Sequence, residues 1–194
     1  DHLNLAKGSP EFRRRFIDMA ICQSFPKYVS ALNEYNRLSA QKNALLKKIS
    51  DISSSSSKLL DVYNEKMAIS AGIISVNRQK YIKALSSQSK ALHEEISGGK
   101  EKLSLEYLTN AGCEEYTKEE YTEKYIKLYS EKKEIEIYRK MCVFGPQKDD
   151  FRILVNEKNS RYFSSQGQQR TAVLCLKLAE GEICFSEFGD YPVF

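Results

Sequence analysis

The stretch LDVYNEKMAISAGIISVNRQKYIKA, residues 60–84, decides the fold class. Mainly apolar positions recur in it at alternating intervals of three and four, which places their side chains on one face of an α-helix. These positions are Leu60, Tyr63, Met67, Ser70, Ile74, Asn77, Tyr81 and Ala84. The stripe continues to Ile96, and Gly98 and Gly99 then end the helix. A helix of this length predicts a mainly α protein.

A second apolar stripe follows Pro26 and predicts a helix of about 25 residues. Its members are Tyr28, Leu32, Tyr35, Leu38, Leu45, Ile49 and Ile52. The serine run at residues 53–57 separates the two stripes, and because serine is a poor helix former we expect a loop there. Two long helices with a short polar link predict an antiparallel, coiled-coil-like arm over residues 26–100, with its tip near 53–57.

Residues 1–25 precede this arm and contain a further helix start. Ser9 is a good N-cap, Pro10 suits the first helical position, and Glu11 is an acid in the first turn. We expect this short helix to connect the arm to a larger core.

Residues 101–160 are expected to hold a few short strands and one long helix. Alternation of apolar residues over 103–107 favours a half-buried strand. Thr117 and Glu120 form a capping box that opens a helix to about Lys140. Two strands are expected on either side of a Gly145-Pro146 turn, at Cys142–Phe144 and Phe151–Asn156. Asp149 and Asp150 beside them are interpreted either as a polar turn or as metal ligands.

The charge balance is mildly basic: 30 Lys and Arg against 26 Asp and Glu give a net charge of +4. Residues 7–48 hold nine basic and three acidic side chains, which makes them a candidate DNA surface. The candidate DNA-binding residues are Arg13, Arg14, Arg15, Lys47 and Lys48. The alternative interpretation of the arginine run is an ordinary solvated helix flank.

The composition also excludes several functions. The chain has two histidines, five cysteines without a CxxC pair, and neither a GxxxxGK[ST] nor a GxGxxG loop. We therefore expect no metal site, no disulfide, and no catalysis by this chain alone. The longest uncharged run, residues 67–77, is too short to span a bilayer, and with no secretory leader we expect a reducing, cytoplasmic location.

Residues 161–194 contain the segment most suggestive of chemistry, SSQGQQRTAVLCLKLAE at 164–180. Ser165 is a good N-cap and Gln168, three positions later, completes a capping box for a helix from about Gln168 to Phe185. Gly167 permits close approach of a ligand to the backbone, and Arg170 adds a fork of donors. The start of such a helix suits a phosphate, although an ordinary capped helix explains the same residues.

Four segments in order resemble the RecF family of ABC- and SMC-type ATPases. They are KGSPEFRRRFID at 7–18, LDVYNE at 60–65, FGPQKDD at 144–150 and SQGQQR at 165–170. The last is similar to that family's version of the ABC signature motif. Gln147 stands where the family usually has histidine.

The resemblance implies that the chain is a helical lobe, arm and signature helix of an ABC-type α/β P-loop ATPase head. The phosphate-binding loop would lie upstream of Asp1, and the acidic metal-binding pair would follow a strand that begins at Pro192–Phe194. ATP and Mg²⁺ would then be cofactors of the intact protein, and the fragment alone would not hydrolyse ATP.

The signature motif of such heads contacts ATP held by a second subunit. The implied ATP-binding residues are Ser165, Gln166, Gly167, Gln168 and Arg170. The family further implies an ATP-dependent homodimer on gapped or junction DNA, working with RecO and RecR to place RecA in recombinational repair and the SOS response. The alternative that the sequence leaves open is a coiled-coil scaffold with no role in nucleotide or DNA binding.

Overall fold

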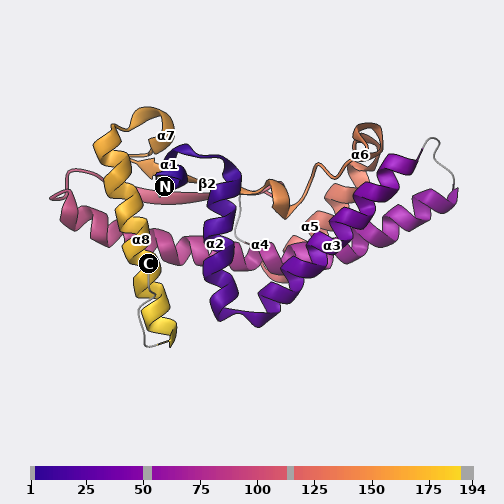
Figure 1. Cartoon of the computed structure of the whole chain (residues 1–194), viewed down its shortest axis with the longest axis horizontal. Coiled ribbons are helices and arrows are strands. Elements are labelled where there is room, and N and C mark those ends of the chain that lie inside the picture. Colours follow the sequence, from indigo (N-terminus) through magenta and orange to yellow (C-terminus); the bar gives the residue numbers. More distant parts are fainter. Residues whose placement is uncertain (1–2, 50–53, 113–115, 189–194) are drawn as a thin grey trace. The chain divides into compact units, whose positions relative to one another are not determined.

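The computed structural model describes residues 3–49, 54–112 and 116–188 and is mainly α-helical, as expected (Figure 1). Its helices are α1 (Asn4–Lys7), α2 (Pro10–Ser24), α3 (Pro26–Lys48), α4 (Ser54–Ile96), α5 (Lys118–Glu131), α6 (Lys133–Arg139), α7 (Ser160–Phe163) and α8 (Gln166–Phe188), with a 3₁₀ turn, η1 (Pro146–Lys148). Its strands are β1 (Leu103–Leu108), β2 (Asp150–Val155) and β3 (Lys158–Asn159). None of the helices in these ranges combines the length and apolarity of a bilayer-spanning segment.

The chain forms two compact units. The mixed unit comprises Asp1–Ser24, Arg78–Leu108 and Asp149–Phe194, and the helical unit comprises Phe25–Asn77 and Thr109–Lys148. Helix α4 contributes to both, because it runs without interruption from Ser54 to Ile96. The strand expected at Pro192–Phe194 lies outside the described residues.

The helical unit contains the expected antiparallel pair of helices. Lys42, near the end of α3, donates a hydrogen bond of 2.6 Å to Asn64, near the start of α4. Of the loop expected at 53–57, Ser53 lies outside the described residues, and Ser54–Ser57 form the first turn of α4. The expectation was wrong because first-turn N–H groups lack partners within any helix, so serine, which disfavours a helix interior, is tolerated there.

Tyrosines of α5 pack the centre of the helical unit. Tyr121, Tyr125 and Tyr129 are buried and stacked at helical spacing, with ring centroids 6.4 Å and 5.7 Å apart along the row. The hydroxyls of Tyr125 and Tyr129 lie 2.8 Å from Ser75 Oγ and 3.2 Å from Tyr35 Oη. The three tyrosines are therefore core residues of the helical unit.

The expected helix over 117–140 is divided at Lys132 into α5 and α6, and its capping box is present. The expected strand at Cys142–Phe144 is absent, because side chains from other parts of the helical unit accept hydrogen bonds from its backbone N–H groups. Glu136 Oε1 accepts the N–H groups of Val143 and Phe144, and Asn43 Oδ1 accepts that of Cys142 at 2.6 Å. With these donors occupied, the segment cannot pair as a strand.

Gly145 follows this segment at a position that only glycine fits. Its φ is 122°, and a Cβ there would lie 2.1 Å from the Tyr35 hydroxyl and 2.6 Å from that of Tyr129. Gln147 accepts a hydrogen bond from Tyr35 and donates one of 2.8 Å to the Phe144 carbonyl. The Gly145–Gln147 turn is therefore tied to the tyrosine row.

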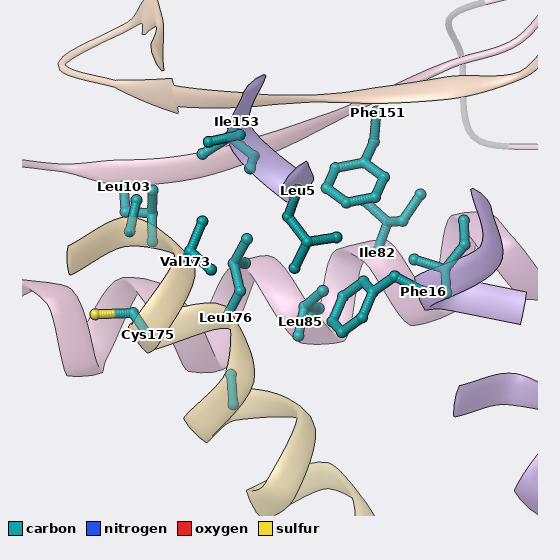
Figure 2. Packing of buried hydrophobic residues seen from close by; sticks show 14 of the residues in the cluster. Leu5, Phe16, Ile82, Leu85, Leu103, Phe151, Ile153, Val173, Cys175 and Leu176 are labelled. Atoms are coloured by element: carbon teal, nitrogen blue, oxygen red, sulfur yellow. The ribbon is translucent and has the colours of Figure 1, made fainter. Parts of the chain in front are cut away.

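The mixed unit is built on a small antiparallel sheet in the order β1-β2-β3. Leu103 pairs with Val155 and Leu105 with Ile153, so the apolar face predicted from the alternation of residues is present. Helices α1, α2, α4 and α8 supply the remaining core side chains, including Leu5, Phe16, Leu85 and Leu176 (Figure 2). This core fixes the start of α8 relative to β1 and the last turns of α4.

Two of the described cysteines are buried, and they belong to different units. Cys142 in the helical unit is 4% exposed and Cys175 in the mixed unit is 0% exposed. Burial raises the pKa of both thiols, so both are kept in the unreactive protonated form. Neither forms a disulfide.

Candidate nucleotide-phosphate site at the start of helix α8

The predicted capping box at the start of α8 is present in both directions. Ser165 Oγ accepts the backbone N–H of Gln168 at 3.2 Å, and Gln168 Oε1 accepts the backbone N–H of Ser165 at 2.8 Å. The helix begins at Gln166, two residues earlier than the sequence suggested. The capping box therefore fixes the backbone of the whole 165–168 turn.

Two amides of this turn remain available to a ligand. The N–H groups of Gln166 and Gly167, the first two of α8, have no hydrogen-bond partner among the residues that the structure describes. The first turn contains no acidic residue, so the positive end of the helix dipole is not neutralised within it. Free amides at a positive helix end match the chemistry of a phosphate oxygen.

Gly167 leaves open space in front of these amides. A Cβ built on it would meet only Ser165 Oγ, at 3.8 Å, so the fold itself does not require glycine there. Ser165, Gln166 and Arg170 are also exposed. The predicted residues are thus brought together on one accessible turn, with the Ser165 hydroxyl beside the free amides.

Two residues of this corner have roles that the sequence did not indicate. Gln169 is 3% exposed, and its Nε2 donates to the carbonyls of Ser160 and Ser164 at 2.8 and 3.3 Å, which holds α7 against the start of α8. Glu101 accepts a hydrogen bond of 2.8 Å from Gln168 Nε2. The only sequence signal for Gln169 was its place in a glutamine-rich run, and Glu101 had none.

The candidate DNA-binding arginines occupy three different environments. Arg13 is 5% exposed and forms a bidentate pair with Asp150, at 2.6 and 2.9 Å, so its predicted contact with DNA is replaced by a structural role. Arg14 donates to the Asp149 carbonyl at 2.7 Å; burial and then the charge of Arg78 lower its pKa. Arg15 is exposed.

Lys47 and Lys48, the remaining candidates, are both exposed in the last turn of α3. Arg15 belongs to the mixed unit and the two lysines to the helical unit.

Asp149 and Asp150 form ion pairs instead of the expected polar turn. Asp149 is 1% exposed and accepts hydrogen bonds from Arg78, at 3.3 Å, and from the Tyr107 hydroxyl. Arg78 also holds Asp18 through two bonds of 2.9 Å. Among the described residues no group of three carboxylate, histidine or cysteine side chains could hold a metal ion. The two aspartates are instead the centre of a buried ion-pair cluster.

No protein-family model matches the chain. Two solved structures of the recombination mediator protein RecF in the RecFOR pathway, described as RecF-ATPrS and RecF-ATP, match with TM-scores of 0.92 and 34% identity. They cover 98% and 99% of this chain and 51% of their own chains. The chain therefore has the fold of part of an ABC-type ATPase head with its arm.

Sequence relatives identify the family. RecF DNA replication and repair proteins of Geobacillus thermodenitrificans, Geobacillus kaustophilus and Staphylococcus haemolyticus are 40%, 39% and 38% identical over the whole chain. The chain is homologous to RecF proteins over its whole length, and it spans 52–53% of the length of these relatives.

Proposed function

We propose that this chain provides the arm and the signature corner of a RecF-type, ATP-dependent DNA-binding protein of recombinational repair. In this proposal the start of α8 contacts the terminal phosphate of ATP bound by a second subunit. Ser165 donates its hydroxyl, Gln166 and Gly167 donate their amides, and Gln168 shapes the turn. Arg170 adds positive charge beside the site.

The observation that carries the proposal is the pair of free amides in a turn whose backbone is already fixed. The Ser165–Gln168 capping box satisfies the third amide of the helix and leaves the first two free. A turn that is held before the ligand arrives loses little further conformational entropy on binding. Phosphate contact therefore adds directly to the association of two subunits, and nucleotide binding and dimerisation become one linked equilibrium.

The residues present fit the terminal phosphate but do not supply the rest of the nucleotide site. The sequence has no P-loop motif, and the described residues contain no cluster suited to Mg²⁺. When bound, ATP and Mg²⁺ would supply the anionic group that bridges two subunits. This chain's own part is to orient hydrogen-bond donors toward that group.

DNA is the proposed second ligand, with gapped or junction DNA as the substrate and RecO, RecR and RecA as the partners. The exposed candidates are Arg15 in the mixed unit and Lys47 and Lys48 in the helical unit. Arg13 is omitted because its guanidinium is bound to Asp150. Such exposed cations would contact phosphates and supply affinity without sequence specificity.

Ser165→Arg in the full-length RecF protein that carries these residues tests the proposal. The arginine side chain would fill the space in front of Gly167, so ATP-driven dimerisation should be lost while each monomer still binds ATP normally. Ser87→Arg, at an exposed position of α4 in the same unit, is the control and should dimerise like the unaltered protein. Analytical ultracentrifugation with and without ATP measures the outcome. Normal dimerisation of the Ser165→Arg variant would refute the contact, and ATP-independent behaviour of the unaltered protein would favour a scaffold.

A further inference from the structure

Glu101 lies beside the signature corner although it is 64 residues before it in the chain. Its backbone is held from two sides. The Ser97 hydroxyl, at the end of α4, donates to the Glu101 carbonyl at 3.4 Å. The next residue, Lys102, exchanges hydrogen bonds of 2.8 and 2.9 Å with Asn156, which follows β2. Glu101 is therefore anchored to both the helix before it and the sheet after it.

The Glu101 side chain is directed toward α8 and is largely removed from solvent. Its Oε1 accepts from Gln168 Nε2 at 2.8 Å, and the side chain is 23% exposed. Its other oxygen lies 3.6 Å from Nε2 of His93. The His93 side chain is 0% exposed, and its two ring nitrogens make no hydrogen bond among the described residues. The carboxylate thus bridges the last turns of α4 and the first turn of α8.

The chemistry of a carboxylate determines how the Gln168 amide is oriented. An ionised carboxylate only accepts hydrogen bonds, so it faces the NH₂ end of the Gln168 amide. The carbonyl end, Oε1, must then face the other way, where it accepts the N–H of Ser165 at 2.8 Å. A rotation of the amide by half a turn would break both bonds at once.

We propose that Glu101 is a positioning residue for the signature corner. It acts through Gln168: by holding the NH₂ end, it keeps the Gln168 carbonyl on the Ser165 N–H and the Ser165 hydroxyl in the capping geometry. This inference rests on the proposed function, in which the nucleotide phosphate of a second subunit binds to the turn that Glu101 helps to hold.

The test compares Glu101→Ala with Glu101→Gln in the full-length RecF protein that carries these residues. Alanine removes the acceptor, so the ATP concentration needed for half-maximal dimerisation should rise by about tenfold, the usual effect of losing one such hydrogen bond. Glutamine restores an acceptor oxygen of the same reach, so Glu101→Gln should recover most of the dimerisation lost in Glu101→Ala. Glu95→Ala removes an exposed carboxylate close by in the chain and controls for net charge.

A second measurement observes the corner directly. Amide hydrogen exchange over residues 164–170 should become faster in Glu101→Ala and stay unchanged in Glu101→Gln and Glu95→Ala. ATP affinity of the isolated subunits should be the same in all four proteins, because the contact is made in trans. A general loss of folding would instead lower that affinity as well.

The outcomes separate this inference from the function on which it rests. If Ser165→Arg abolishes dimerisation while Glu101→Ala dimerises and exchanges like the unaltered protein, Glu101 has no positioning role and the inference is overturned. If the unaltered protein does not dimerise with ATP, the proposed function fails. The exchange experiment then still decides whether Glu101 holds the 165–168 turn.

Discussion

Replacing Lys42 with methionine should strongly destabilise the helical unit. The Lys42 side chain is 2% exposed, and its ammonium donates to Glu136 Oε2 and to Asn64 Oδ1 while lying 5.0 Å from the Tyr129 ring centroid. Methionine fills nearly the same space but leaves the Glu136 carboxylate, also 2% exposed, without its cation. Removing one member of a buried ion pair costs about 3–5 kcal/mol.

A second substitution shows whether the loss of stability in Lys42→Met arises from the buried, unpaired charge of Glu136. Glu136→Gln keeps an acceptor for the Val143 N–H, which Glu136 Oε1 holds at 2.9 Å, and removes the negative charge. The Lys42→Met/Glu136→Gln double variant should therefore be more stable than Lys42→Met alone, by at least about 1 kcal/mol. Lys47→Met, at an exposed position of the same helix, should stay within about 0.5 kcal/mol of the unaltered chain.

Urea unfolding measures these differences. The near-ultraviolet circular dichroism of tyrosine is weighted toward the helical unit, which contains the buried tyrosine row. The midpoint is read from that signal, because two units need not unfold together. Equal midpoints for Lys42→Met and Lys47→Met would refute the reasoning, since the buried pair would then contribute no more than an exposed lysine.

Three further predictions concern the same unit. Gly72→Ala should destabilise it by about 1–3 kcal/mol in urea unfolding, because the added Cβ would lie 2.3 Å from Thr122 Oγ1. Thr117→Ala should cost about 1 kcal/mol by removing the capping box with Glu120, and a melting curve identical to that of the unaltered chain would count against the cap. Burial, and after it the neighbouring Tyr35, hold the pKa of Tyr129 well above 10.0. The stability that the protonated Tyr129 phenol contributes is therefore fully present below about pH 10 and is lost as the pH rises further. Titration by absorbance at alkaline pH should show the Tyr129 phenol ionising only as the helical unit unfolds.

Local signals in the sequence predicted the features that depend on neighbouring residues. The capping boxes at Thr117 and Ser165 were predictable because each is closed by residues within one turn. The strand at Leu103–Leu108 was predictable because alternation of apolar residues is itself a local pattern. The same argument explains why the long stripe of α4 was recognised.

Features that depend on distant partners were not predictable. Arg13 lies on a helix that looks solvated until Asp150, 137 residues later, is placed beside it. The segment at Cys142–Phe144 has the composition of a strand, but Glu136 and Asn43 take its N–H groups. In the candidate site, the capping motif at Ser165 is itself a local signal, whereas the contribution of Glu101 depends on a chain fold that brings residues 101 and 168 together.

The two buried cysteines described above allow the local opening of each unit to be followed by thiol labelling. Cys142 and Cys175 belong to different units, and in the folded state both are shielded from an alkylating reagent. Pulses of such a reagent, followed by mass spectrometry of the two peptides, would therefore time the opening of each unit separately. If the helical unit opens while the mixed unit stays closed, Cys142 should be labelled before Cys175.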